Sequence, residues 1–390
     1  MRTPKGILVI LSTLVLFLFL TEVSGFSAPK LPSMIGIATS GLGTAGHTTA
    51  LAYGPVMEKF LGVPVRVMPA DSTKTNFSQI REKKALFVGG GVSPSSQGTV
   101  IEGRHPFCVE GWGPQKLGTV WMGYDGPYGF AVRGDSSIKS IKDLKGKKIA
   151  WYSASPGWMS GAEGALRFGG LTLKDVELVR LGSYAACARA VVEGKADADY
   201  LMVSSAVTFE IAESPSGIRF LPMPLEDKEG WARYHELNPL IARGISEKGV
   251  KVARGIPMAN HVFTCSTYLD VDSEHMYHIA RFFGEAYDQY KDKNKDLEDM
   301  SLKKMREFLD TKCLPVHPGV IKYLKEKNLW MAEDDKWNQE RLEEMKQYEK
   351  AWMTALKEAN TKGIKVDLNN EKWLKHWGDY LAKLPPFKMR

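Results

Sequence analysis

The chain has 390 residues, of which 44% are hydrophobic, so it can bury the cores of two domains or of one body with two lobes. Its 52 basic and 45 acidic residues are well mixed and give a net charge of +7. This balance favours a solvated basic surface over a nucleic-acid interface, and it is compatible with an anionic ligand.

The N-terminus has the pattern of an export signal. Two basic residues precede the apolar run Ile7–Leu20, and small residues follow at Val23-Ser24-Gly25. The run is shorter than the roughly 20 apolar residues that a membrane-spanning helix needs. We therefore predict a signal peptide over residues 1–25, cleaved ahead of Phe26, and a soluble periplasmic protein, with an uncleaved N-terminal anchor as the alternative.

Strand-like runs alternate with amphipathic stretches from Met34 to about Arg219. This alternation predicts parallel sheets covered by helices. The predicted strands are residues 34–39, 63–68, 85–90, 117–123, 128–134, 147–153, 175–181 and 196–203. A single sheet of eight or more strands is one interpretation of this series. Between the fourth and fifth strands, however, Tyr124-Asp125-Gly126-Pro127 favours a turn, which we interpret as a crossing between two lobes.

A later strand-like run, residues 261–269, is expected to cross back into the first lobe. Helices follow, including a long one over 334–358 in which charged and apolar residues recur at helical spacing. We expect this tail to pack against the first lobe, with a docking or dimer role as the alternative. The predicted fold is α/β and bilobal: lobe one spans 33–124 plus 262–390 with the C-terminal helices, and lobe two spans 125–261.

A glycine-rich loop follows the first predicted strand. Gly41 to Gly46 spell G-x-G-x-x-G, and Asp71 closes the next strand-like run, which together outline a dinucleotide site. Export argues against NAD, and His47 and Thr48 are polar where packing of a helix on a sheet would prefer apolar residues. The glycines are expected to let the backbone approach the carboxylate of a captured solute instead, with Asp71 as a turn residue or helix cap.

Four turns rich in small polar residues each follow a predicted strand and precede a predicted helix, at 39–47, 70–76, 152–158 and 203–208. In an α/β sheet such turns lie at the carboxyl ends of the strands, where helix N-termini offer free N–H groups to an anion. Ordinary helix capping is the alternative for any one of them. With Tyr124 and the glycines ending the third strand, the candidate ligand-binding residues are Thr39, Ser40, Gly43, Thr44, His47, Ser72, Thr73, Asn76, Gly90, Gly91, Tyr124, Ser153, Ser155, Gly157, Trp158, Ser204 and Ser205.

Several stretches resemble the TAXI-type solute-binding receptors that serve TRAP transporters. They are EGWGPQKLGTVW (110–121), SIKSIKDLKGKKIAW (137–151), LVRLGSYAACARAVVEGKADADYL (178–201) and LPVHPGVIKYLKEKNLW (314–330). The resemblance implies a type II periplasmic-binding-protein fold, with a ligand in the cleft between two α/β lobes. It also implies a TRAP-type membrane permease as partner.

One departure from the family concerns the lobe-two loop, which usually reads G-S-G-T and here reads Ser155-Pro156-Gly157-Trp158. Trp158 replaces a small hydroxyl residue with a large flat ring, so the usual small dicarboxylate or glutamate of the family is not carried over. An aromatic carboxylate covered by Trp158 or Tyr124 is one interpretation, and ordinary packing of both rings is the other.

Signals for catalysis or a cofactor are weak. There is no G-x-S-x-G, and Glu274, His275 and His278 lack a third metal ligand nearby. His47 is interpreted as a group that orients a ligand or caps a helix. Four scattered cysteines without C-x-x-C leave zero, one or two disulfides open. We predict a monomeric solute-binding protein, not an enzyme, with no cofactor, metal or nucleic acid; a secreted hydrolase or lyase on the same fold is the alternative.

Overall fold

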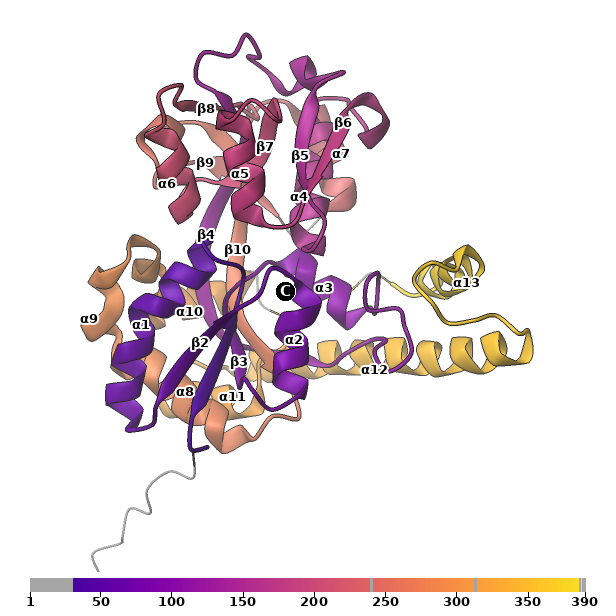
Figure 1. The fold of residues 1–390 in the computed structure, drawn as a ribbon. Helices are drawn as coiled ribbons and strands as arrows, with labels where there is room; N and C mark the ends of the chain where they lie inside the picture. The colour runs from indigo at the N-terminus through magenta and orange to yellow at the C-terminus, as the bar shows by residue number, and fades with distance from the viewer. Residues whose placement is uncertain (1–30, 239–240, 312–313, 386, 388–390) are drawn as a thin grey trace, which may run out of the picture.

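The structure is a computed structural model that describes residues 31–238, 241–311, 314–385 and 387. The predicted signal peptide lies outside these residues. Helices and strands alternate along most of the chain, and the predicted α/β fold with two lobes is confirmed (Figure 1). None of the described helices combines the length and apolar character needed to cross a bilayer.

The strands are hydrogen-bonded in the order β2-β1-β3-β10-β4-β7-β5-β6. In that order they are β2 (Val65–Pro69), β1 (Ile35–Thr39), β3 (Phe87–Val92), β10 (Pro257–Tyr268), β4 (Leu117–Arg133), β7 (Ala198–Met202), β5 (Lys148–Tyr152) and β6 (Glu177–Leu181). Two more strands extend this arrangement: β8 (Ile218–Phe220) pairs with β4, and β9 (Ala242–Ile245) pairs with β10. The outer pairs in both lobes are parallel, whereas β10 pairs antiparallel with both β3 and β4.

Two long strands connect the lobes. In Figure 1, β4 and β10 run from the lower lobe into the upper one. They pair antiparallel from Tyr128 opposite Ala259 to Leu117 opposite Tyr268, with two irregularities between Val262 and Ser266. Because both lobes share these two strands, their sheets form one hydrogen-bonded path.

The predicted turn at residues 124–127 is wrong, because β4 runs unbroken through it. Gly126 faces His261 in the ladder with β10, and a Cβ built on it would lie 2.6 Å from the Phe263 ring. Glycine therefore stands here to allow close packing between the two crossing strands rather than to make a turn. Pro127 lies just before Tyr128, where pairing with β7 begins.

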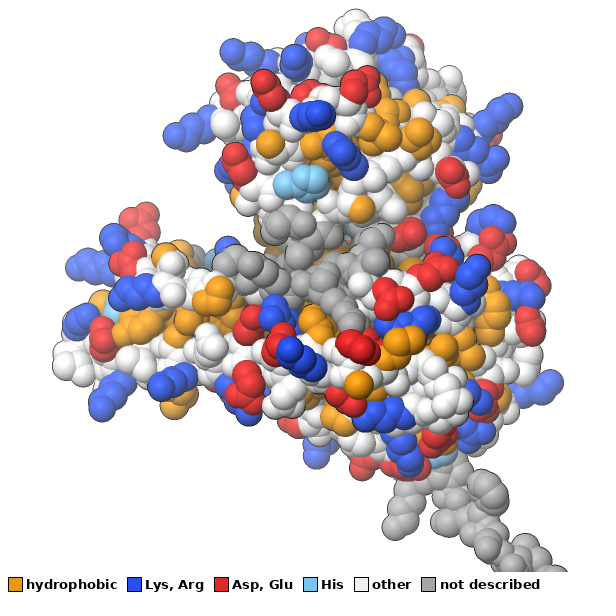
Figure 2. Space-filling view, turned by 180° about the vertical axis from the view of Figure 1, so that it is seen from behind, with side chains coloured by type: hydrophobic (Ala, Val, Ile, Leu, Met, Phe, Trp, Pro, Cys, Tyr) orange, Lys and Arg blue, Asp and Glu red, His pale blue; other side chains and the backbone are white. Residues whose placement is uncertain are grey.

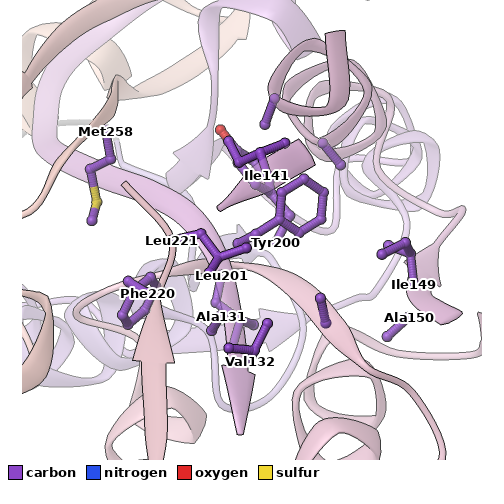
Figure 3. Close-up of a cluster of buried hydrophobic side chains, with 14 of the residues drawn as sticks. Ala131, Val132, Ile141, Ile149, Ala150, Tyr200, Leu201, Phe220, Leu221 and Met258 are labelled. Atoms are coloured by element: carbon purple, nitrogen blue, oxygen red, sulfur yellow. The ribbon is translucent and has the colours of Figure 1, made fainter. Parts of the chain in front are cut away.

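Each lobe has its own hydrophobic core. The core of lobe two gathers side chains from β4, β5, β7 and the helices around them, and Figure 3 shows part of it around Tyr200 and Leu201. Two further clusters belong to lobe one. A small cluster of Ala45, Tyr124, Met202 and Phe263 lies where the crossing strands leave lobe one.

The helices surround these sheets. Lobe one carries α1 (Ala45–Leu61), α2 (Thr73–Arg81), α3 (Pro94–Ile101), α8 (Ser273–Glu285), α9 (Tyr287–Tyr290), α10 (Leu302–Thr311) and α11 (Pro318–Glu326). Lobe two carries α4 (Pro156–Phe168), α5 (Tyr184–Val192), α6 (Ala206–Ala212) and α7 (Lys228–Leu237). Short 3-10 turns are η1 (Ile141–Leu144), η2 (Leu173–Asp175), η3 (Lys251–Ala253), η4 (Lys291–Lys293) and η5 (Lys295–Met300).

The C-terminal helices pack against lobe one, as predicted. The long helix α12 (Ala332–Thr361) and α13 (Glu371–Leu381) project to one side (yellow in Figure 1). Trp352, Trp373 and Trp377 from this pair surround Cys108, and the Trp373 indole donates a 2.7 Å hydrogen bond to the Cys108 carbonyl. Cys108, Cys187 and Cys265 are buried free thiols, and Cys313 lies outside the described residues.

The surface seen from behind carries basic and acidic side chains interspersed over both lobes, with apolar side chains among them (Figure 2). On this face the pattern matches the mixed, solvated surface that the composition predicts.

Trp373→Ala should lower the free energy of unfolding by about 3–5 kcal/mol, because it removes a fully buried ring and leaves a cavity. Urea denaturation of the full chain measures this loss. Met353→Ala is a matched control on α12, since the Met353 side chain is 66% exposed, and it should cost less than about 0.5 kcal/mol. Equal effects of the two substitutions would contradict the packing of the C-terminal helices.

Candidate functional site

A cavity between the lobes collects residues from both of them, and we call it the interlobe cavity. The space open to the centre of a water-sized sphere is about 60 Å³. One water needs about 10–15 Å³ by the same measure, so the cavity has room for a group of roughly four to six non-hydrogen atoms. Its size suits a small organic molecule held between closed lobes.

Nine of the sequence-predicted residues line this cavity: Ser40, Thr44, Thr73, Asn76, Tyr124, Ser155, Gly157, Trp158 and Ser205. The structure therefore brings the glycine loop, the start of α2 and the lobe-two turns to one place. The other eight, which are Thr39, Gly43, His47, Ser72, Gly90, Gly91, Ser153 and Ser204, lie outside the lining.

Several of these eight residues support the lining residues. The Thr39 hydroxyl donates to the Ser40 carbonyl and lies 3.3 Å from His47 Nδ1. Burial lowers the pKa of His47 below its ordinary value, so this imidazole is neutral near pH 7. Ser72, rather than Asp71, caps α2 by accepting from the Thr75 amide.

The remaining residues of the eight have other roles. Gly43 takes a φ of +80°, which favours glycine, and its carbonyl accepts from the Val207 amide. Gly90 also has a positive φ, +95°, and lies with Gly91 in β3. The Ser153 hydroxyl accepts from Arg180.

Ser204 belongs to a second groove between the lobes, away from the lining of the interlobe cavity. The Ser204 hydroxyl donates a 3.0 Å hydrogen bond to the Asp296 carboxylate in η5. The Nζ atom of Lys248, in lobe two, lies 2.5 Å from a carboxylate oxygen of Asp299. Asp299 also accepts from the Asp125 amide on the crossing strand β4. These contacts join lobe two to η5 next to the crossing.

The N-terminus of α1 offers unpaired donors to the interlobe cavity. Thr44 caps this helix by accepting from the His47 amide, and its hydroxyl lies 2.7 Å from that of Ser40. The amides of Ala45 and Gly46 have no hydrogen-bond partner among the described residues, and both residues line the cavity. The Thr44 hydroxyl donates to the Gly41 carbonyl, which leaves the Ser40 hydroxyl as a donor. Together with the free N–H groups and the positive end of the helix dipole, it suits a carboxylate.

Two other helix N-termini at the cavity, those of α2 and α4, use amides in contacts between the lobes. The Gly157 amide of α4 donates to the Ser96 hydroxyl at 3.0 Å, and the Thr73 amide of α2 donates to the Ala154 carbonyl at 3.3 Å. The Tyr152 hydroxyl donates to the Asp71 carbonyl. Because these bonds bridge the cleft directly, the structure has its lobes in contact at the rim.

Aromatic side chains form much of the wall. Tyr124 stacks on Phe263 with ring centroids 5.1 Å apart, and Tyr128, Tyr152, Tyr184 and Tyr200 add further rings. The predicted flat surface of Trp158 is mostly taken up by the lobe-two core, since the residue is 6% exposed and its indole donates to the Tyr200 carbonyl. Packing therefore accounts for most of this ring, although Trp158 also lines the cavity.

A buried histidine completes the wall on β10. Burial lowers the pKa of His261 to about 3, so this imidazole is neutral at physiological pH. Its Nε2 lies 3.1 Å from the Tyr200 hydroxyl and 3.5 Å from that of Tyr234. The described lining residues include no lysine or arginine, and Asp71 is the one acidic residue among them.

Sequence reasoning missed part of the lining. Ser93 and Ser96 lie at the start of α3, where Ser93 caps the helix, and the run VSPSSQG (92–98) carries the same strand-turn-helix signal as the four predicted turns. Tyr128, Tyr200, His261 and Phe263 come from the middle of strands. No local signal distinguishes such residues from ordinary core positions until the crossing of β4 and β10 is known.

The part of the chain that the structure describes contains no group of three or more His, Cys, Asp or Glu side chains placed to hold a metal ion. Glu274 and His278 instead pair with each other on α8, 3.3 Å apart.

Fold and site together define a two-lobed α/β protein with a cavity between its lobes. The family model of the NMT1-like family matches residues 44–327, and the chain belongs to this family. No curated protein matched the chain in sequence.

Solved structures similar to this chain include several two-lobed proteins. An ArgBP variant from T. maritima aligns with a TM-score of 0.44 and 12% identity over 68% of this chain and 94% of that chain. The GluR0 ligand-binding core from Nostoc punctiforme, in complex with (L)-glutamate, aligns with a TM-score of 0.40 and 12% identity over 68% of this chain and 97% of that chain. The periplasmic sulfonate-binding protein SsuA from Methylobacillus flagellatus KT aligns with a TM-score of 0.38 and 14% identity over 73% of this chain and 74% of that chain.

His261 should make the protein less stable in mild acid. The unfolded chain takes up a proton at this residue below about pH 6.5, whereas the folded chain does so only near pH 3. The free energy of unfolding therefore falls as the pH drops through this window, by about 1.4 kcal/mol per pH unit. When the pH is lowered from 7 to 5, the free energy of unfolding should fall by about 2 kcal/mol less in His261→Gln than in the wild type. Urea denaturation at the two pH values measures this difference. The same loss in both proteins would contradict the neutral, buried state of His261.

Proposed function

We propose that this protein is an extracytoplasmic solute-binding protein that captures a small organic anion by its carboxylate in the interlobe cavity. The observation that carries the proposal is the pair of unpartnered amides of Ala45 and Gly46 beside the Ser40 and Thr44 hydroxyls. A carboxylate placed there would accept from both amides and from the Ser40 hydroxyl, because the Thr44 hydroxyl already donates to the Gly41 carbonyl. Such charge-assisted hydrogen bonds are the strong ones.

The proposed binding cycle uses the two lobes as rigid units, 33–124 plus 262–390 and 125–261. Bonds across the rim, such as that from the Gly157 amide to Ser96, hold the lobes together beside the cavity. In this proposal a solute enters when the lobes separate about the crossing strands. Closure then adds contacts from lobe two, including Ser155 and Ser205. Hinge closure around a ligand is a recurrent way to couple binding to a change of shape.

We also propose a place for this protein in a transport system. The resemblance of four stretches to TAXI-type receptors supports a TRAP-type permease as the partner that receives the solute. The signal-peptide pattern at residues 1–25 supports export and a periplasmic location. In this proposal the mature protein works as a monomer without a cofactor and releases its solute unchanged; turnover of a bound solute by the purified protein would contradict it and favour the hydrolase or lyase alternative.

Ser40→Ala should weaken carboxylate binding about ten- to a hundredfold, because a hydrogen bond to a charged group contributes roughly 1.5–3 kcal/mol. Calorimetry of the purified protein against a panel of small carboxylates measures the change. Ser78→Ala is the control, since the Ser78 hydroxyl bonds Glu82 on the exposed part of α2 and lies outside the cavity lining. Unchanged affinity in Ser40→Ala, with the melting temperature preserved, would contradict the position of the carboxylate.

A further inference from the structure

Asp71 is a carboxylate in the wall of the interlobe cavity that has no hydrogen-bond donor among the described residues. Neither of its oxygens accepts a hydrogen bond or an ion pair from a described residue, and Oδ1 is fully buried. Burial raises the pKa of this carboxyl, and no lysine or arginine contributes to the shift. Asp71 is half-buried, and a buried carboxylate oxygen that lacks a donor costs free energy, so a partner for Oδ1 is expected from outside the chain.

A second unpartnered acceptor belongs to the same wall. Asn76, on the first turns of α2, is 5% exposed and lines the cavity, and its Oδ1 has no hydrogen-bond partner in the described part of the chain. Because Asn76 and Asp71 flank the start of one helix, both oxygens mark one side of the cavity as rich in acceptors.

The rest of the lining suits a cation in the same way. The described lining residues contribute five tyrosine rings, Trp158 and Phe263, but no lysine or arginine. Aromatic faces attract cations through their quadrupoles, and His261 is neutral. The charge of the described lining side chains is therefore set by Asp71.

Asp71 also lies beside the glycine loop that leads into the free amides of Ala45 and Gly46. A Cβ built on Gly41 would lie 1.9 Å from Asp71 Oδ1, so the carboxyl packs against the loop that precedes the α1 amides. A bare anion at those amides would be repelled by Asp71 a short distance away. A solute that carries a positive donor next to its carboxylate would satisfy both groups.

We propose that Asp71, with Asn76 beside it, selects a solute that carries a protonated amine close to its carboxylate. This inference rests on the proposed function and sharpens it: the carboxylate lies on the amides of Ala45 and Gly46, and the amine donates to Asp71. The class of ligand is a small zwitterion with one carboxylate, because the described lining offers no cationic side chain for a second one.

The test uses three pairs of probes in which an amine group is replaced by a carbon group of the same size. They are glycine and propionate, alanine and isobutyrate, and sarcosine and butyrate. In calorimetry with the full wild-type chain, the amine member of the tightest-binding pair should bind at least about tenfold more tightly than its partner. This comparison needs no variant, so it holds whether or not a substitution affects folding.

Asp71→Asn should then reduce that preference at least about tenfold, because it removes the charge and keeps the shape. Asp288→Asn is the matched control, since it removes a carboxylate whose side chain is 84% exposed on α9, and the preference should stay unchanged. Equal affinity within every pair, or a preference that survives Asp71→Asn, would overturn the inference while carboxylate binding itself stands. Failure of all six probes to bind would contradict the proposed function as well.

Discussion

The antiparallel pairing of β4 with β10 is the constraint on which the rest of the structure depends. These two strands belong to the sheets of both lobes, and their irregular pairing between Val262 and Ser266 lies next to the cavity. Bulges weaken a ladder locally and change its twist, which makes this stretch the natural place for bending. Close packing there requires Gly126, whose missing Cβ leaves room for the Phe263 ring.

The crossing also explains why the site needs both lobes. Ser40, Thr44 and the α1 amides come from lobe one, whereas Tyr152, Ser155 and Ser205 come from lobe two. Direct bonds such as that from the Gly157 amide to Ser96 hold the rim together. On the opposite side of the crossing, Lys248 and Asp299 form a charged contact between the lobes that would have to rearrange if the lobes separated.

The sequence predicted the elements better than their connections. Strands such as β1, β5 and β7 follow from apolar runs with clear turns on both sides, and α12 follows from its helical spacing of charges. The turn predicted at Gly126-Pro127 is wrong, although both residues usually mark turns, because β4 runs straight through them. Only the position of Phe263 shows why glycine is needed there. Turn residues such as Ser40, Thr73 and Ser155 were found by their strand-turn-helix context, whereas His261 and Tyr200 became visible only through long-range pairing.

Hydrogen exchange measured by mass spectrometry tests the central claim, that one small solute is held by both lobes in the interlobe cavity. The solute is the tightest-binding carboxylate of the calorimetric panel, added at saturation. The account predicts slower exchange in peptides that cover 40–47 and 70–77 of lobe one and, at the same time, in peptides that cover 153–159 and 203–208 of lobe two. Protection confined to one lobe, or centred on the groove around Lys248 and Asp296, would contradict it.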